Sequence, residues 1–167
     1  MSTRVSVNTY AHSLTFVTDK LLTSVKNIIR LSGLDPSKLA NDWVVLERGI
    51  KVWLGSTHLQ ELHLEVYNPN TDELVGRWDF EIFYGYNGDG SFWQDPEAIK
   101  YHIRKQGLWP SLCDYRVVVT NQPGYQNVQG WSSATLRSTD GFVRQSIGTT
   151  IDGSGLSSGT SYWRRVS

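Results

Sequence analysis

The stretch from Leu74 to Tyr84, LVGRWDFEIFY, decides the fold class, because its large apolar residues alternate with charged ones. One face carries the apolar side chains Leu74, Trp78, Phe80, Ile82 and Tyr84. The other face carries the charged side chains Arg77, Asp79 and Glu81. A period of two is typical of a half-buried β-strand. The stretch therefore predicts a strand whose aromatic face is covered and whose charged face meets water.

The residues before this strand predict an antiparallel partner for it. Leu62, Leu64 and Val66 alternate with charged or polar residues, as they would in a second half-buried strand. The run Asn68–Asp72, NPNTD, is typical of a turn. Residues 59–84 therefore predict one long β-hairpin.

Three segments carry helix start and stop signals around apolar residues spaced three and four positions apart. The boundaries are Ser13 and Gly33, then Asp35-Pro36 and Gly55, and finally Asp95-Pro96 and Gly107. Residues 1–12 are polar and predict an N-terminal arm. An α+β fold follows, with three helices packed on one face of an antiparallel sheet. The residues expected to meet in the core are Trp78, Phe80, Ile82, Leu62 and Leu64 from the sheet and Leu21, Val25, Trp43 and Leu46 from the helices.

The chain changes in texture after a third predicted strand, Asp114–Asn121. Residues 123–167 are rich in Gly, Ser and Thr but keep isolated apolar residues. Short strands are expected at 142–151 and 161–166, joined by a flexible linker at 153–159. We therefore expect a single domain, 1–167, with its core in residues 13–121 and a less stable C-terminal region in residues 122–167.

The composition excludes several functional classes. The 167 residues contain 16 basic and 16 acidic side chains, so the formal net charge is zero, which disfavours a broad nucleic-acid or membrane-binding surface. The single Cys113 forms no internal disulfide and builds no thiolate metal cage. No run is long and apolar enough for a signal peptide or a membrane span, so a cytoplasmic protein without cofactor is expected.

No motif indicates catalysis convincingly. Gly155–Gly159, GLSSG, matches the nucleophile pattern G-x-S-x-G, but neither a strong strand nor a helix flanks it, and no histidine follows His102. Asn87–Gly90 resembles the start of a calcium loop, yet Pro96 occupies the position of the bidentate glutamate. Cys113 could be a nucleophile with His102 as its base, but it is interpreted as a small buried thiol. The protein is not expected to be an enzyme, and a small hydrolase using Cys113 or Ser157 is the alternative.

Several of these segments together resemble the HORMA family. The match runs from about Ser13 to Trp163 and is most specific in KVWL at 51–54 and the hairpin LQELHLEVYNPNTDELVGRWDFEI. The segments GDGSFWQDPEAIKYHI, WSSATLRSTDGFVRQSIGTT and SYWRR are most similar to the bacterial HORMA proteins of CBASS-type anti-phage operons. The resemblance implies a HORMA-like fold in which residues 122–167 form a C-terminal "safety belt".

The resemblance also implies a function at the sheet edges. A closure-motif peptide would add as a strand beside residues 114–121, the belt would wrap over it, and the C-terminal strands would pack against Arg77–Ile82. The peptide-binding residues would be Tyr115, Arg116, Val117, Val118, Val119 and Trp131. Trp131 is equally compatible with a structural plug under a long loop. Because the chain ends four residues after Trp163, a partner protein is expected to supply the peptide.

The implied partners are those of a signalling adaptor. In its peptide-bound, closed state the protein would bind and activate a cGAS/DncV-like nucleotidyltransferase. An AAA+ ATPase would reopen it by engaging the arm, residues 1–12. A HORMA adaptor in chromosome or DNA-repair assembly is the alternative within the same family.

Overall fold

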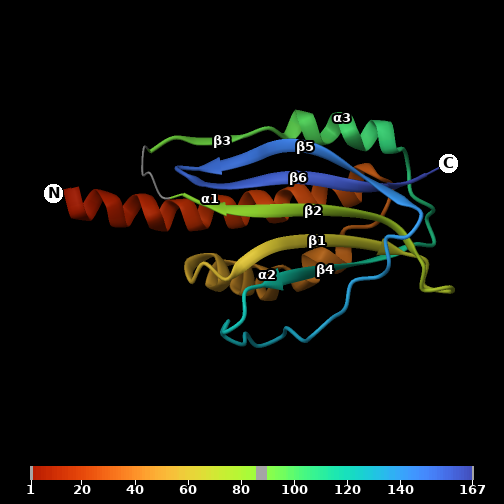
Figure 1. Cartoon of the computed structure of the whole chain (residues 1–167), viewed down its shortest axis with the longest axis horizontal. Helices are drawn as coiled ribbons and strands as arrows, with labels where there is room; N and C mark the ends of the chain where they lie inside the picture. The colour runs from red at the N-terminus through yellow and green to blue at the C-terminus, as the bar shows by residue number, and fades with distance from the viewer. Residues whose placement is uncertain (1, 86–89, 167) are drawn as a thin grey trace.

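The structure is a computed structural model, and it describes residues 2–85 and 90–166, with side chains from Tyr10 onward. Three helices and six strands follow one another along the chain (Figure 1). The helices are α1 (Ser2–Leu31), α2 (Ser37–Gly55) and α3 (Pro96–Gln106). The strands are β1 (Leu59–Tyr67), β2 (Leu74–Tyr84), β3 (Phe92–Gln94), β4 (Asp114–Asn121), β5 (Phe142–Gly153) and β6 (Leu156–Arg165).

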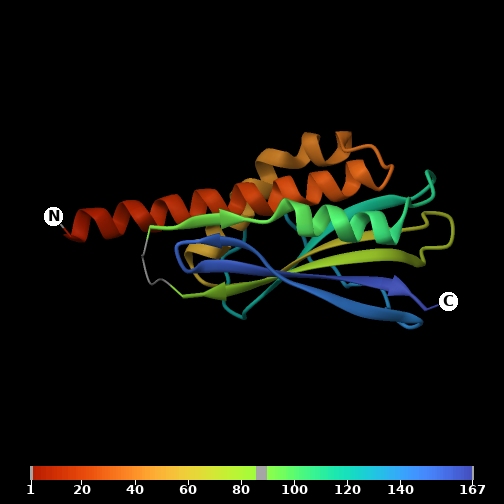
Figure 2. The same cartoon turned by 90° about the horizontal axis from the view of Figure 1, so that it is seen from above.

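All six strands form one antiparallel sheet in the order β3-β5-β6-β2-β1-β4. The predicted hairpin is its centre, where β1 and β2 pair from Glu61 opposite Glu81 to Tyr67 opposite Leu74. The helices lie on one face of the sheet, as seen from above in Figure 2. This arrangement confirms the expected α+β fold of three helices on an antiparallel sheet.

The aromatic face of the central hairpin forms the core. Trp78, Phe80, Leu62 and Leu64 are all fully buried, and they belong to the same cluster as buried residues of α1 and α2. Trp43 of α2 is only partly buried and packs at the margin of this cluster. Trp78 also stacks on Tyr162 of β6 with ring centroids 4.7 Å apart, so the C-terminal strand belongs to the core.

The predicted capping signal is confirmed in full only at the start of α3. Asp95 Oδ1 accepts a hydrogen bond from the backbone N–H of Ala98 at 3.1 Å, with Pro96 in the first turn of α3. α2 begins at Ser37, one residue later than expected, because Pro36 is at the N-cap position and makes no side-chain cap. Asp35 Oδ1 accepts a hydrogen bond from the backbone N–H of Ser37 at 2.9 Å just before the helix. The predicted start of α1 at Ser13 is wrong, because the helix begins at Ser2 and Ser13 is a buried residue within it. No Gly or Pro interrupts residues 2–12, so the segment expected to be an arm continues the helix.

The C-terminal region is more ordered than its composition suggests. Residues 153–159, expected to be a flexible linker, form the tight turn at Ser154-Gly155 and the start of β6 instead. β6 pairs with β2 on one side and β5 on the other, from Leu156 opposite Tyr84 to Trp163 opposite Arg77 on the β2 side. Backbone pairing on both sides overrides the low β-propensity of Ser and Gly. The short strand β3, which pairs with β5, was not predicted.

The expectation that the second face of the sheet is open to water is also wrong at its centre. His63, Glu65 and Asp79 point away from the helices, yet their exposed fractions are 1%, 0% and 2%. They are covered and paired by residues from the last third of the chain. Glu81, farther along β2, is exposed as expected.

Replacing Phe80 with alanine tests the core. Phe80→Ala should lower the free energy of unfolding by about 3–5 kcal/mol, because a fully buried aromatic ring is lost and a cavity is left. Phe83→Ala is the matched control on the same strand, since Phe83 is 46% exposed, and it should cost less than about 1 kcal/mol. Urea denaturation followed by far-UV circular dichroism measures both, and equal losses would contradict the proposed core.

Candidate peptide-binding site

The outer edge of β4 has no neighbouring strand. β4 pairs with β1 on one side and is the last strand of the sheet. Within the described chain, no backbone hydrogen bond joins residues 114–121 to residues 122–141, which we call the belt loop. Lys38 Nζ donates to the carbonyl oxygen of Tyr115 at 2.8 Å and so occupies one acceptor at the start of this edge. The remaining edge is a template for an added strand.

The belt loop faces this open edge and leaves a groove beside it. The loop leaves β4 at Asn121 and runs back along the strand to β5 (Figure 1). Two adjoining cavities of about 340 Å³ each lie between them, which is within the size range of ligand sites. Both are lined by Val117, Val118, Trp131 and belt-loop residues 132–134. The two cavities therefore form one continuous groove along β4.

All six residues predicted from the sequence line this groove, although their side chains differ in role. Val117 and Val119 are partly buried against the core on the helix side of the sheet, and Val118 is buried on the other side. Tyr115 is buried, and its hydroxyl donates to the carbonyl oxygen of Asp35 at 2.7 Å. The ring of Tyr115 is thus packed in the core, so only its backbone groups could contact a ligand.

Trp131 holds the belt loop to α2. Its indole Nε1 donates to the carbonyl oxygen of Val45 at 2.9 Å, and its ring meets Trp53 edge-on with centroids 4.9 Å apart. The ring lies so close to Gly49 that a Cβ atom there would come within 2.3 Å of Nε1. Because Trp131 also lines both cavities, it is an anchor of the loop and a wall of the groove at once.

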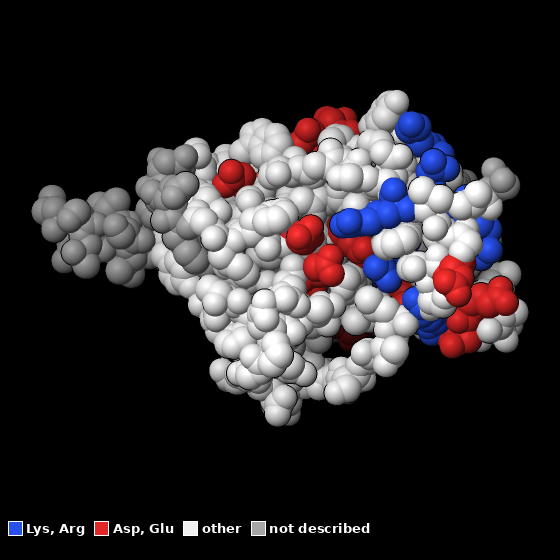
Figure 3. Space-filling view, viewed as in Figure 1, with Lys and Arg blue, Asp and Glu red and all other residues white. Residues whose placement is uncertain are grey.

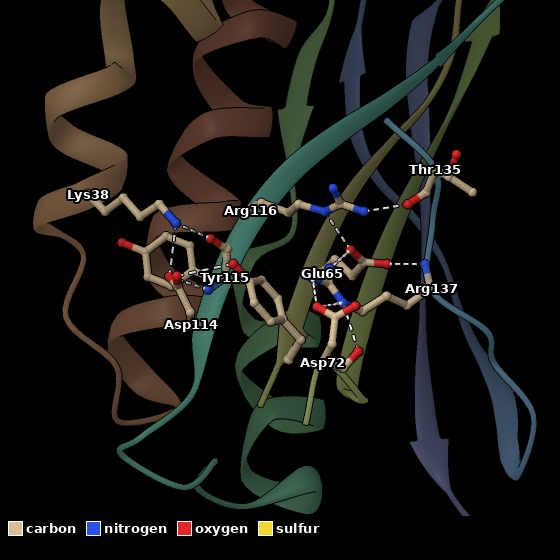
Figure 4. Close-up of polar contacts among 9 residues, drawn as sticks. Lys38, Glu65, Asp72, Asp114, Tyr115, Arg116, Thr135 and Arg137 are labelled. Carbon is tan, nitrogen blue, oxygen red and sulfur yellow. Dashed lines mark hydrogen bonds and ion pairs between the residues drawn. The ribbon is translucent and has the colours of Figure 1, made fainter. Parts of the chain in front are cut away.

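A cluster of charged residues ties the far end of the belt loop to the sheet (Figure 4). Glu65 of β1 is fully buried and accepts from Arg116 Nε, from Arg137 Nη1 and from the Arg137 backbone N–H, each at 2.6 Å. Arg137 Nη2 also contacts Asp72 Oδ1 at 2.6 Å, and its guanidinium lies 3.6 Å from the ring centroid of Tyr67. Arg116 donates in addition to the carbonyl oxygen of Thr135. We call this set the belt latch, because Arg137 and Thr135 are belt-loop residues.

A second buried carboxylate ties the last strand to the sheet. Asp79 of β2 contacts His63 Nδ1 at 2.6 Å, Arg77 Nε at 2.9 Å and the indole Nε1 of Trp163 at 2.8 Å. Burial by itself would raise the pKa of Asp79, but the hydrogen bonds from His63, Arg77 and Trp163 outweigh it and lower the pKa to about 2. His63 Nε2 is in turn 2.9 Å from Thr120 Oγ1 of β4. The carboxylate thus connects the docked β6 to the strand that borders the groove.

The strand pattern does not show that these two carboxylates are buried, because alternation along a strand identifies a face and not what covers it. Trp163 is one of the isolated apolar residues of the polar C-terminal region, and Arg137 was not singled out. Their carboxylate partners lie 84 and 72 positions earlier. The local signal was the presence of several ionisable residues on both central strands, where few charges are usually found.

The motifs weighed for catalysis are separated or embedded in the fold. Ser157 lies within β6 opposite Phe83, so GLSSG is not a strand-to-helix turn. His102 Nδ1 lies 3.1 Å from the hydroxyl of Tyr162, and burial raises the pKa of Cys113. The described residues include no cluster of three His, Cys, Asp or Glu suited to a metal ion, and most of the Asn87–Gly90 loop is outside them. None of the described helices combines the length and apolarity that crossing a bilayer requires.

Acid titration tests the buried Asp79. Its stabilising effect is fully present above the ordinary pKa of 3.8 and is lost as the pH falls through about 2. Wild-type protein should therefore lose about 2 kcal/mol of unfolding free energy between pH 4 and pH 2 from this group. Asp79→Asn should be less stable at neutral pH but should lose correspondingly less over that window, as measured by urea denaturation. Glu81→Gln, exposed on the same strand, is the control, and parallel curves for wild type and Asp79→Asn would contradict the assignment.

A double-mutant cycle tests the belt latch. Arg137→Ala should cost about 3 kcal/mol and speed amide exchange in the belt loop, because Glu65 would keep a buried charge with one cation fewer. Adding Glu65→Gln should recover part of the loss, since the remaining group is neutral. Arg48→Ala on the exposed side of α2 is the control. If the two latch substitutions add without coupling, the latch does not hold the loop.

The sequence and the structure were compared with known proteins. The sequence has no significant match among curated proteins. A chain of the mitotic checkpoint complex superposes with a TM-score of 0.76 at 13% identity, covering 93% of this chain and 99% of that one. Caenorhabditis elegans HTP-2 bound to HTP-3 closure motif 1 gives a TM-score of 0.63 at 12% identity, with coverages of 89% and 85%.

A bacterial structure also has the same fold. A chain of the Escherichia coli MS115-1 CdnC:HORMA-deltaN complex superposes with a TM-score of 0.59 at 14% identity and covers 94% of this chain and 89% of its own. At these identities the structural likeness concerns the fold. The family assignment comes from the sequence, which matches bacterial HORMA domain 2 over residues 1–166. The chain therefore belongs to the bacterial HORMA domain 2 family.

Proposed function

We propose that the protein is a peptide-binding signalling adaptor whose ligand adds as a strand to the open edge of β4. The observation that carries the proposal is the groove itself, where an unpaired strand edge faces a loop that makes no backbone hydrogen bonds to it within the described residues. An extended peptide would satisfy the backbone groups of β4, and alternate side chains would enter the two cavities. Tyr115, Arg116, Val117, Val118, Val119 and Trp131 would be the contacting residues.

The walls of the groove favour an apolar peptide segment near the C-terminal end of β4. Trp53, Tyr125, Val128 and Trp131 surround the cavity there. The indole N–H of Trp53 is already bonded to the carbonyl oxygen of Gln126 at 2.7 Å, as that of Trp131 is to Val45, so both rings offer apolar surface. A bulky aliphatic or aromatic side chain of the peptide would therefore contribute most to binding affinity when it lies in this cavity.

The closed arrangement of the belt would retain a bound peptide. The belt loop crosses the groove between two fixed points, Trp131 on α2 and Arg137 on Glu65. Residues 132–136 lie between them, and all but the partly buried Leu136 are exposed. A peptide under this stretch can leave only after one of the two attachments is released, so binding and release are coupled to opening of the belt.

The fold neighbours suggest partners for such an adaptor. One neighbour is bound to a closure motif, and another is in a complex with CdnC, which suggests a closure-motif protein and a cGAS/DncV-like nucleotidyltransferase as partners here. In this scheme, peptide binding favours the closed state, and the closed state binds and activates the nucleotidyltransferase in anti-phage defence. An AAA+ ATPase would reopen the protein by pulling on residues 1–12, whose helical backbone from Ser2 it would have to unwind.

Peptide affinity tests the proposal. A peptide selected from a library by the purified protein should bind Trp131→Ala more weakly by about 2 kcal/mol, or about 30-fold, because a central aromatic wall and a belt anchor are lost. Ala134→Trp should also weaken binding, by filling the groove while leaving both attachments of the loop intact. Isothermal titration calorimetry measures both.

The controls separate the groove from other surfaces and chemistries. Trp93→Ala removes an exposed tryptophan from β3, far along the sheet order from β4, and should leave affinity unchanged. Cys113→Ala and Ser157→Ala should also leave peptide binding intact, as expected of a non-enzymatic adaptor. Unchanged affinity in both Trp131→Ala and Ala134→Trp would place the peptide elsewhere and sink the proposal.

A further inference from the structure

The groove beside β4 contains a buried hydrogen-bond acceptor that the protein itself does not satisfy. Asn121, the last residue of β4, lines the cavity at the end of that strand together with Trp53, Tyr125 and Trp131. Its side-chain oxygen Oδ1 is buried, and among the described residues no donor lies within hydrogen-bond distance of it. A buried polar atom without a partner is destabilising, so folded proteins rarely keep one. This exception lies in the wall of a ligand cavity.

Backbone pairing holds Asn121 at this place. Asn121 lies opposite Leu59 of β1, and the next residue, Gln122, donates its backbone N–H to the carbonyl oxygen of His58 at 2.7 Å. Because Asn121 follows Val119 by two residues, its side chain lies on the same face of β4, toward the helices. The residue therefore stays beside the cavity while the strand is paired. The terminal torsion of an Asn side chain is broad, so the amide can turn Oδ1 toward a group in the cavity.

The surroundings of this acceptor are uncharged, and their indole donors are already used. The indole N–H groups of Trp53 and Trp131 are bonded to backbone carbonyl oxygens of the protein. The residues that line the cavity are all aromatic, aliphatic or uncharged polar. Residues 122–136 include no Lys, Arg, Asp or Glu, and the surface that they form below the sheet in Figure 3 is white. A ligand that supplies a neutral donor would therefore satisfy Asn121 without competition from a charged side chain.

The walls around Asn121 favour an aromatic ligand side chain. The ring of Trp53 meets that of Trp131 at 77° with centroids 4.9 Å apart, and it meets that of Tyr125 at 90° with centroids 5.9 Å apart. Rings that stand steeply against one another offer both faces and edges on which a further ring can pack. A side chain that matches both the rings and the acceptor needs a bulky apolar body and one donor at its end. Tyrosine and tryptophan have this combination, whereas phenylalanine, leucine and methionine lack the donor.

We infer that this cavity selects a tyrosine or tryptophan of the bound peptide, whose O–H or N–H donates to Asn121 Oδ1, an inference that rests on the proposed function. Backbone pairing along β4 gives affinity for any extended peptide and does not select its sequence. Asn121 adds selection, because a peptide without the donor leaves a buried acceptor unpaired. A lysine also carries donors, but it would bring its charge into a cavity that no carboxylate lines.

A comparison of tyrosine with phenylalanine in the peptide tests the inference. The probe is the peptide that the purified protein selects from a library, synthesised with Tyr or Phe at each position in turn. At one position, Tyr should bind about 10-fold more tightly than Phe in isothermal titration calorimetry. Asn121→Leu should reduce this preference to less than about 2-fold while binding the Phe peptide at least as tightly as wild type, which shows that the groove is intact. Asn127→Leu removes an exposed amide from the same cavity wall, and this matched control should keep the preference.

The peptide-free protein provides a second measurement. Asn121→Leu should leave the free energy of unfolding unchanged or raise it, because an unpaired acceptor is replaced by an apolar group. Urea denaturation measures this quantity. A clear loss of stability would show that Asn121 Oδ1 already has a partner within the protein, and it would overturn the inference.

The outcomes distinguish the inference from the function on which it rests. Equal affinities for Tyr and Phe at every position, with binding still weakened by Trp131→Ala and Ala134→Trp, would overturn the inference and leave the proposed function standing. A peptide affinity that neither of these two groove variants changes would overturn both. Tighter binding of lysine than of tyrosine at the selected position would assign the cavity to a cation and overturn the inference.

Discussion

The arrangement of this protein depends on two carboxylates buried on the face of the sheet that the helices do not cover. Glu65 and Asp79 lie on neighbouring central strands and are 0% and 2% exposed. An ionised carboxylate in such a place is costly unless charged or strongly donating groups surround it. Part of each set of donors comes from the last third of the chain, from Arg137 and from Trp163. The buried carboxylates of the central hairpin therefore keep their hydrogen-bond partners only when the C-terminal region is packed against the sheet.

These hydrogen bonds to buried carboxylates explain how a polar region rich in glycine and serine takes a defined path. Residues 122–141 have few apolar anchors, and hydrophobic burial alone would hold them weakly. Trp131 supplies one attachment to α2, and the belt latch supplies the other. Between them the loop needs no backbone bonds to β4, so the edge of that strand stays open beneath it. Because only these two attachments hold the loop, it can detach when either one is broken.

The two edges of the central hairpin are completed in different ways. On the β2 side, β6 adds a full set of backbone bonds and places Trp163 on Asp79. On the β1 side, β4 is added, and its own outer edge pairs with no other described strand. A hydrogen-bonded path from Trp163 through Asp79 and His63 to Thr120 crosses the sheet between these edges. Docking of the hairpin and the geometry of the groove are thus physically connected.

Local periodicity and capping chemistry determined much of this fold. The hairpin of β1 and β2, the bounds of β4, and the starts of α2 and α3 follow from alternation, turn residues and Asp-Pro signals, because these depend on interactions within a few residues. The family resemblance predicted that residues 115–119 lie at a sheet edge that receives a peptide. In the structure these residues line the groove. The predicted start of α1 was wrong because Ser13, a residue type that often caps helices, lies inside this helix and not at its start.

Only the tertiary structure decided what covers the second face of the sheet and how the C-terminal region is held. The strand pattern marks Glu65 and Asp79 as facing away from the helices, and it contains nothing about Arg137, 72 positions later, or Trp163, 84 positions later. The serine- and glycine-rich start of β6 has weak intrinsic preference for a strand and becomes one because β2 and β5 offer it two sets of backbone partners. Such pairings join residues far apart in the sequence, so they cannot be inferred from the residues next to either partner.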